Sequence, residues 1–337
     1  MIKPTSSIQI PRRKDVLAAS TPPDSSRLIQ FKTILVPVDF SRESLRVLDY
    51  AILLAQQFGA GVHPVHVRPR IEATAIQRAG GLMGNYRDHV SFLLDRLEDI
   101  EHKYRLKFSP DHCHIRSGRP FAEICKLARQ IDSDLIILGS RGHSGLKRVL
   151  LGSTAERVIR FAPCPVLVPR GQRYKAVIGL TRRTTRLKLR NILVPTDFSD
   201  CSAAAVNYAL FLAGKFKAKL ELLYSMEEYV DFLAQSGMSR VLAGLHEADR
   251  LAAQDQMKKF KRLHIPSNVP CETEILTGYP VDQICAQSRR PELDLLIMST
   301  HGRSGFQHAL MGSVAEQVAR YAECPVFTVP SRYRVVQ

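Results

Sequence analysis

The stretch Gly139-Ser140-Arg141-Gly142 is followed, after nine further residues, by Gly152-Ser153. A near copy, Ser299-Thr300-His301-Gly302, is followed at the same interval by Gly312-Ser313. Each shared glycine is separated from its counterpart by 160 residues. Solenoid repeats have periods of roughly 20–50 residues, so a repeat of this length indicates two complete domains, each with its own core.

Further stretches recur with nearly the same offset. The segment Ile34–Ser41 returns 158 residues later as Ile192–Ser199, and Gly118-Arg119-Pro120 returns 160 residues later as Gly278-Tyr279-Pro280. The chain has 337 residues, 45% of them hydrophobic, which suffices for two domains of ordinary size. We therefore predict a flexible basic tail over 1–30, domains over 31–170 and 190–331, and a basic linker over 171–189.

Short apolar runs alternate with helical patterns in both halves. In the first half, strands are expected at Thr33–Val38, Val62–Val67, Cys113–Arg116, Leu135–Leu138 and Pro165–Val168. Helices are expected after the capping residues Ser41 and Ser44 and at Tyr86–Tyr104, Phe121–Gln130 and Arg148–Phe161. In the second half, strands are expected near Asn191–Thr196, Leu220–Leu223, Glu272–Leu276, Leu295–Met298 and Val326–Val329. This alternation specifies an α/β fold, a parallel sheet with helices on both faces.

The formal net charge of +16 is concentrated outside the two predicted domains. Residues 1–32 carry six basic and two acidic side chains, and residues 170–190 carry eight basic and no acidic ones. Such segments attract nucleic acid or other anionic partners, and the linker is the only candidate for nucleic acid in this chain. Its single aromatic residue, Tyr174, is too little for the repeated base stacking of single-strand binders, which favours a solvated spacer instead.

The seven cysteines indicate a reducing compartment. Their number is odd and no Cys-x-x-Cys pair occurs, so neither a disulfide framework nor a zinc ribbon is indicated. No apolar run reaches the roughly 18 residues that cross a membrane. Arg12-Arg13 is followed by too short an apolar stretch for an export signal. We expect a cytoplasmic protein with no membrane partner.

Glycine and hydroxyl residues favour a phosphate site in the first half. Gly139 and Gly142 let a ligand approach the backbone, and a helix starting near Gly152 offers free amides beside the hydroxyls of Ser153 and Thr154. Positive charge is available close by, from Arg141, Lys147 and Arg148. The alternative is that these glycines only form tight turns.

A metal site at Asp111-His112-Cys113-His114 is a weaker hypothesis. These residue types are metal ligands. On a strand, however, the two histidines would face opposite to the cysteine, and a surface strand edge explains the cluster equally well. We expect no metal there.

From Phe31 to Pro330 the chain resembles the universal stress protein family. Its ATP-binding members carry Gly-x2-Gly-x9-Gly-Ser/Thr and an aspartate after the first strand, facing the adenosine. The resemblance therefore implies two doubly wound, adenine nucleotide alpha hydrolase-like domains, each with a five-stranded, mainly parallel sheet. It also implies that the domains pair about an internal pseudo-two-fold axis through their Cys-Pro-Val strands, and that homodimers can form.

The resemblance also implies site residues and a cofactor, ATP, optionally with Mg²⁺. In the first half the implied residues are Val38, Asp39, Val67, Gly139, Arg141, Gly142, Gly152, Ser153 and Thr154. In the second half they are Thr196, Asp197, Gly302, Gly312, Ser313 and Val314. Ser299 replaces the first glycine of that motif, and Ser225 stands where valine would meet adenine, so weaker binding is expected there.

Three functions are compatible with this pattern. The first is a cytoplasmic stress-response regulator that senses or stores adenine nucleotide without fast chemistry. The second is a slow ATPase or phosphotransferase, although the chain lacks the Gly-x4-Gly-Lys-Ser/Thr loop of phosphate-transferring enzymes. The third is an interaction scaffold that binds no nucleotide. The first is our prediction, with no catalytic residue assigned.

Overall fold

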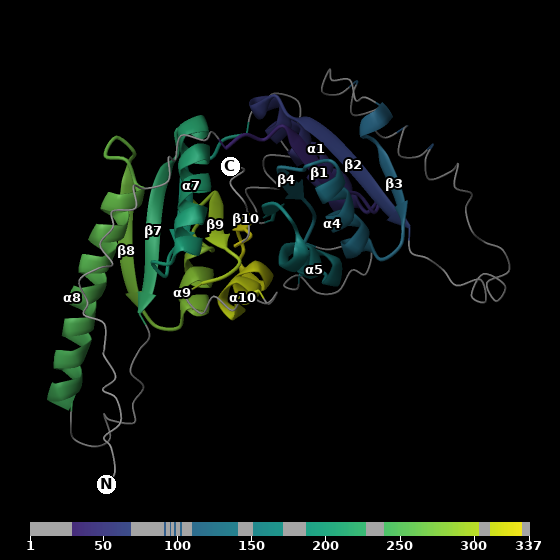
Figure 1. Ribbon diagram of the computed structural model, residues 1–337. Helices are drawn as coiled ribbons and strands as arrows, with labels where there is room; N and C mark the ends of the chain where they lie inside the picture. The colour runs from purple at the N-terminus through teal and green to yellow at the C-terminus, as the bar shows by residue number, and fades with distance from the viewer. Residues whose placement is uncertain are drawn as a thin grey trace, which may run out of the picture.

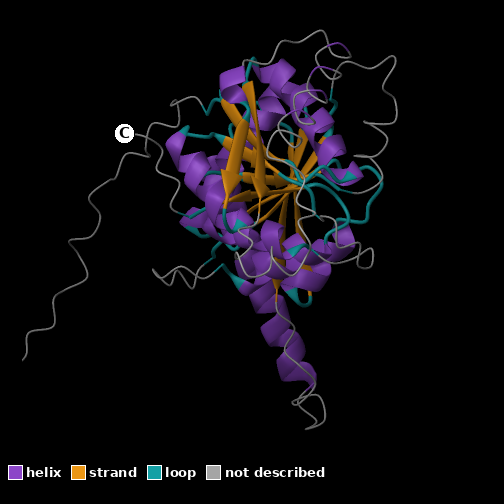
Figure 2. Cartoon of the chain, turned by 90° about the vertical axis from the view of Figure 1, so that its right-hand side faces the viewer, coloured by secondary structure: helices purple, strands orange, loops and turns teal. Residues whose placement is uncertain are grey.

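The computed structural model describes residues 29–68, 110–140, 151–170, 187–226, 239–302 and 311–331, with isolated helical positions at 91, 95, 98 and 102. Most of the helix expected at Tyr86–Tyr104, together with the tail and most of the linker, lies outside the described residues. The described residues form one ten-stranded sheet with helices on both faces, shown in Figures 1 and 2.

The two halves repeat the same series of elements. The first contains β1 (Thr33–Pro37), α1 (Arg42–Phe58), β2 (Gly61–Arg68), the 3-10 turn η1 (Pro110–His112), β3 (His114–Ser117), α4 (Pro120–Gln130), β4 (Leu135–Ile137), α5 (Ser153–Phe161) and β5 (Val166–Val168). The second contains β6 (Asn191–Pro195), α7 (Asp200–Phe216), β7 (Lys219–Met226), α8 (Ser239–His264), β8 (Cys271–Thr277), α9 (Pro280–Gln287), β9 (Leu295–Ser299), α10 (Ser313–Tyr321) and β10 (Val326–Val329).

The strand order is β3-β2-β1-β4-β5-β10-β9-β6-β7-β8. The five strands of each half are parallel, and the halves meet where β5 and β10 pair antiparallel, with Leu167 opposite Phe327. The order of the second half therefore mirrors that of the first, as an internal pseudo-two-fold axis requires. The α/β fold and the central strand pairing confirm the expectation, and the pairing covers two sheet edges that would otherwise be open.

Each face of the sheet has an apolar core that crosses the boundary between the halves. On the α1 and α7 face, Phe327 is 1% exposed and its ring lies 6.3 Å from that of Phe31 and 5.5 Å from that of Tyr208. On the other face, α4 and α5 of the first half share one cluster with α9 and α10 of the second. The halves are thus packed as a single body.

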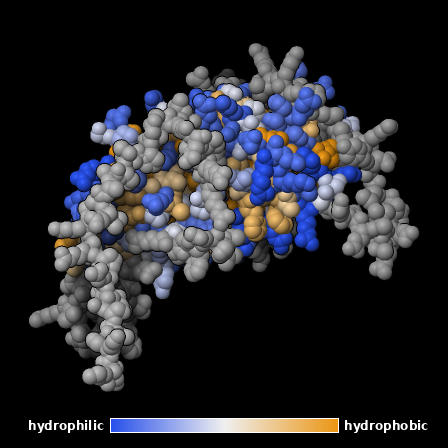
Figure 3. All heavy atoms as spheres, in the orientation of Figure 1, coloured by the Kyte–Doolittle hydropathy of each residue, from blue (hydrophilic) through white to orange (hydrophobic). Residues whose placement is uncertain are grey.

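Reciprocal ion pairs link α5 to α10 across the pseudo-two-fold axis. Arg160 lies 3.0 Å from Glu316, and Arg320 lies 2.9 Å from Glu156. All four side chains are about a quarter exposed, so water screens the charges and the network adds little stability. Figure 3 shows hydrophilic and apolar residues mixed on one face of the molecule.

Three expectations about element boundaries were wrong. The segment expected to be a helix over Arg148–Phe161 is not helical at Leu151 and Gly152, and α5 begins at Ser153, because Gly152 has an extended backbone and donates its N–H to the carbonyl of Ser140 at 2.7 Å; residues 148–150 lie outside the described part of the chain. The third strand begins at His114 rather than Cys113, because η1 occupies the preceding residues. The end of the predicted linker is not a solvated spacer, because Leu187 and Leu189 are buried in the shared core.

Candidate functional site

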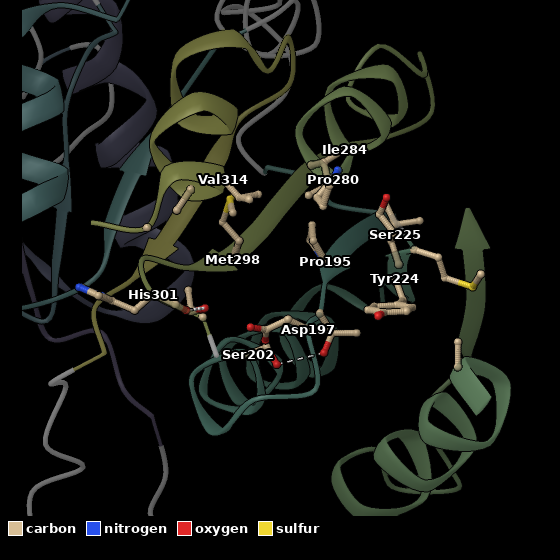
Figure 4. A pocket seen from close by; sticks show the side chains of 18 of the residues that line it. Pro195, Asp197, Ser202, Tyr224, Ser225, Pro280, Ile284, Met298, His301 and Val314 are labelled. Carbon is tan, nitrogen blue, oxygen red and sulfur yellow. Dashed lines mark hydrogen bonds between the residues drawn. The ribbon is translucent and has the colours of Figure 1, made fainter. Parts of the chain in front are cut away.

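A pocket of about 770 Å³ lies at the carboxyl edge of the second half. Its wall comes from the residues after β6 and β9, the end of β7, the start of α10 and one face of α8. Figure 4 shows Tyr224 and Ser225 of β7 across the cavity from His301 and Val314. The six residues that the sequence assigned to this half all line it: Thr196, Asp197, Gly302, Gly312, Ser313 and Val314.

Asp197 is held in a turn at the start of α7. Its Oδ1 accepts hydrogen bonds from the N–H of Ser199 at 3.1 Å and from the Ser199 hydroxyl at 2.6 Å. Ser199 in turn caps α7 by accepting the N–H of Ser202. Between them, Phe198 has φ +63°, a left-handed conformation that costs energy in a residue with a side chain and is typical of functional sites. The carboxylate is therefore fixed before any ligand arrives.

The first half contains the same turn. Oδ1 of Asp39 accepts the N–H of Ser41 at 3.0 Å and its hydroxyl at 2.6 Å, and Phe40 also has φ +63°. Phe40 packs on His66 and Phe198 packs on Tyr224, with ring centroids 4.5 and 4.6 Å apart. Because both halves keep this costly backbone, the turn is a shared feature of the duplicated fold.

The start of α10 presents backbone amides to the pocket. Gly312 is the N-cap residue, it has no side-chain capping bond, and its own N–H is bonded to the carbonyl of Thr300 at 2.8 Å. The first N–H groups of a helix have no partner within it and carry partial positive charge. Ser313 and Val314 therefore place amides, and Ser313 a hydroxyl, where anionic oxygens bind well.

Gly302 lies directly against Asp197. A Cβ at position 302 would be 2.5 Å from Oδ2 of Asp197. Real side chains do not approach so closely, so any other residue here would displace either the Asp197 carboxylate, which Ser199 holds at its other oxygen, or the loop after β9. The loop and the aspartate turn are thus packed together in the wall of the pocket.

Ser299 lines the pocket, and its hydroxyl is turned onto its own loop. It is 9% exposed at the end of β9, and its hydroxyl donates a 2.5 Å hydrogen bond to the carbonyl of His301. The Ser299 side chain thus forms a hydrogen bond within its own loop. Three roles for Ser299 can therefore be distinguished: its Cβ crowds a phosphate, its hydroxyl contacts a phosphate, or its hydroxyl stiffens the loop as seen here.

Part of the pocket wall is apolar. Leu223 and Met226 of β7 and Met298 of β9 are buried beside it, and Ala253 of α8 completes the wall. Sequence reasoning missed the α8 residues Asp249, Ala252, Ala253 and Gln256. They carry no motif, and only a small-residue step, Ala252-Ala253, marks where a helix could approach a ligand closely.

In the first half, the described site residues lie along the same edge of the sheet. Val38 is buried after β1, with its N–H bonded to Val65 and its carbonyl 2.8 Å from Nδ1 of His66. The remaining described residues are Asp39 after β1, Val67 in β2, Gly139 after β4, Gly152 at the cap of α5, and Ser153 and Thr154 in its first turn. Arg141 and Gly142 lie outside the described residues.

Comparison with known proteins decides the family. The profile described as the universal stress protein family matches residues 30–170 and, a second time, residues 188–330. The chain belongs to the universal stress protein family. Slr1230, a universal stress protein of Synechocystis, is 24% identical over 88% of this chain and 99% of its own length. MJ0531 of Methanocaldococcus jannaschii is 32% identical over 42% of this chain and 81% of its own length.

Solved structures agree on the tandem architecture. A universal stress protein from Archaeoglobus fulgidus matches with a TM-score of 0.56 and 20% identity, covering 90% of this chain and 98% of that one. PA1789 of Pseudomonas aeruginosa matches with a TM-score of 0.60 and 20% identity, covering 89% and 92%. At this identity the likeness concerns the fold alone.

The described part of the chain offers no helix long and apolar enough to cross a membrane.

All seven cysteines have free thiols, and burial raises the pKa of Cys125 to about 11. A thiol so seldom ionised is a poor nucleophile, so this cysteine serves as a core residue.

Proposed function

We propose that this universal stress protein binds adenine nucleotide, with ATP as the ligand, and acts as a cytoplasmic stress-response regulator. One observation carries the proposal. The uncapped start of α10, the glycine loop after β9 and the fixed carboxylate of Asp197 surround one pocket, whose volume is within the usual 300–1,000 Å³ of small-ligand sites.

The pocket offers different contacts to the two parts of a nucleotide: the start of α10 on one side suits the phosphates, and β7 on the other side suits the base. Phosphate oxygens would accept hydrogen bonds from the amides of Ser313 and Val314 and gain from the helix dipole. The base would lie against the β7 side of the pocket, at Leu223 and Tyr224, where burial of its faces is favourable. Asp197, anchored at one oxygen by Ser199, would accept a hydroxyl or amino hydrogen of the nucleoside.

The first half is proposed to bind in the same way. Its aspartate turn at Asp39 has the hydrogen bonds of the second half, and Gly152 caps α5 as Gly312 caps α10, again with no side-chain bond. The motif of ATP-binding relatives is complete here, at Gly139, Gly142, Gly152 and Ser153. Mg²⁺ would accompany the triphosphate rather than occupy a protein site of its own.

Mass spectrometry of the freshly purified, denatured chain tests this function. We expect co-purified ATP, because a pocket with fixed amides and a preformed carboxylate loses little entropy on binding. ADP in its place would indicate turnover and favour an ATPase. If no nucleotide co-purifies and none binds in a calorimetric titration, the scaffold interpretation replaces the proposal.

The variant Ser299→Gly tests how the second site differs from the first. Removing the hydroxyl that holds the carbonyl of His301 should loosen the loop, so we expect nucleotide binding by the second half to weaken by about threefold, the cost of one modest hydrogen bond. Calorimetry with ATP measures the effect. Stronger binding would show that the Cβ is the limiting contact, and unchanged affinity would show that Ser299 has no part in the site.

A further inference from the structure

A pair of histidines lies at the outer part of the first half's sheet. Nδ1 of His63 on β2 is 3.1 Å from Nε2 of His114 on β3. His114 is the residue paired with Val65, two positions along from His63, so both side chains are on the same face of the sheet. The ring of His112 stacks on that of His63, with centroids 4.1 Å apart. The sequence cluster at 111–114 is thus completed by a residue about 50 positions away.

The second half has carboxylates at the equivalent positions. Glu274 is paired with Leu223 as His114 is with Val65, and Glu221 precedes Leu223 by two residues. Arg290 lies 2.7 Å from Glu221, so that pair contains its own cation. The residue 160 positions before Arg290 is Gln130, which is uncharged and accepts a hydrogen bond from Arg116. Among the described residues, the second half therefore has a cation at this position after α9, and the first half has none at the corresponding position, the last residue of α4.

The geometry points to a binding site for one divalent transition-metal ion between His63 and His114. Imidazole nitrogen is a preferred ligand of Ni²⁺, Cu²⁺ and Zn²⁺. Two metal–nitrogen bonds of about 2.05 Å that meet at 90–109° hold their nitrogens about 2.9–3.3 Å apart. The observed separation of 3.1 Å lies within that interval.

Binding requires a small rearrangement of protons. In the His63–His114 hydrogen bond one ring donates and the other accepts. The donor ring must carry its proton on its other nitrogen, so that two lone pairs face the ion. Burial and neighbouring positive groups lower the pKa of both rings, which favours the neutral form that a metal ligand requires.

The site would be an open one. Among the described residues no group of three or more His, Cys, Asp or Glu side chains is arranged to hold a metal, so water would complete the coordination. His112 holds the ring of His63 by stacking and is not a ligand in this position. Arg116 bears a positive charge that acts on His114, and this charge would weaken binding. The pair is near the amino ends of β2 and β3, away from the nucleotide edge.

Calorimetric titration of the full chain with Ni²⁺ tests the proposal, since Ni²⁺ binds imidazole without oxidising the free thiols. We expect one equivalent to bind, and both His63→Gln and His114→Gln to weaken that binding at least tenfold. His264→Gln, which alters a half-buried histidine on α8, is the control and should bind as the parent does. Circular dichroism without metal verifies that each variant is folded.

A variant that removes a charge should change the Ni²⁺ affinity in the opposite direction. Arg116→Gln removes the nearby positive charge and should tighten Ni²⁺ binding by about threefold or more. A merely structural histidine pair would not respond in this way. Wild-type stoichiometry and affinity in both histidine variants, or no tightening in Arg116→Gln, would overturn the site.

Discussion

Gly302→Val is expected to weaken nucleotide binding by the second half at least tenfold, which is about 1.4 kcal/mol. The added Cβ would meet Oδ2 of Asp197 at 2.5 Å. Either the carboxylate leaves the turn that Ser199 holds, or the loop after β9 moves away from the start of α10. Both changes separate groups that the proposed ligand must contact together.

Isothermal titration with ATP measures this loss, and two further variants make it specific. Gly214→Ala is the control, because a Cβ at that helical position meets nothing within 4 Å. Gly142→Val should have the corresponding effect on the first half, as the 160-residue repeat implies. Two unchanged sites in a folded Gly302→Val protein would contradict the assignment of this pocket.

Phe327→Ala is expected to lower the free energy of unfolding by about 3–5 kcal/mol. The side chain is 1% exposed at the centre of β10 and packs against Phe31 and Tyr208. Its loss would leave a cavity in a core that both halves share. Urea unfolding followed by circular dichroism measures the change.

The same experiment tests whether the halves unfold together. Because the core cluster contains residues from both halves, we expect one transition that shifts as a whole. Leu263→Ala, at a side chain 69% exposed on α8, should change stability by less than about 0.5 kcal/mol. Two separate transitions, with only one affected by Phe327→Ala, would show that the halves fold independently.

Much of the fold followed from local patterns. The last strand matched its predicted bounds, Val326–Val329. Four consecutive apolar or β-branched residues after a Cys-Pro turn strongly favour a buried strand. The predicted start of α5 was wrong because it is set by the hydrogen bond that the N–H of Gly152 donates to the carbonyl of Ser140, a residue of the preceding loop. Local helix propensity contains no information about a hydrogen-bond partner in another segment of the chain.

Some residues of the candidate site could be predicted from local sequence patterns, and others could not. Glycine, aspartate and hydroxyl residues could be identified from the repeat, since the two halves preserve them at a common offset. The α8 residues Asp249 and Gln256 could not, because nothing in their spacing distinguishes the wall of a pocket from any exposed helix face. His63 was likewise not linked to His114, because their distance depends on strand register.

By itself the sequence determined the duplicated α/β architecture, the family and the edge of the sheet at which we propose that nucleotide binds. These depend on periodicity and on short motifs, which are properties of neighbouring residues. The tertiary structure decided that Gly302 lies against Asp197, that the Ser299 hydroxyl is turned onto its own loop, and that two histidines meet across β2 and β3. Those contacts join residues far apart in the chain or depend on one rotamer, and only packing of the whole sheet brings such groups within bonding distance.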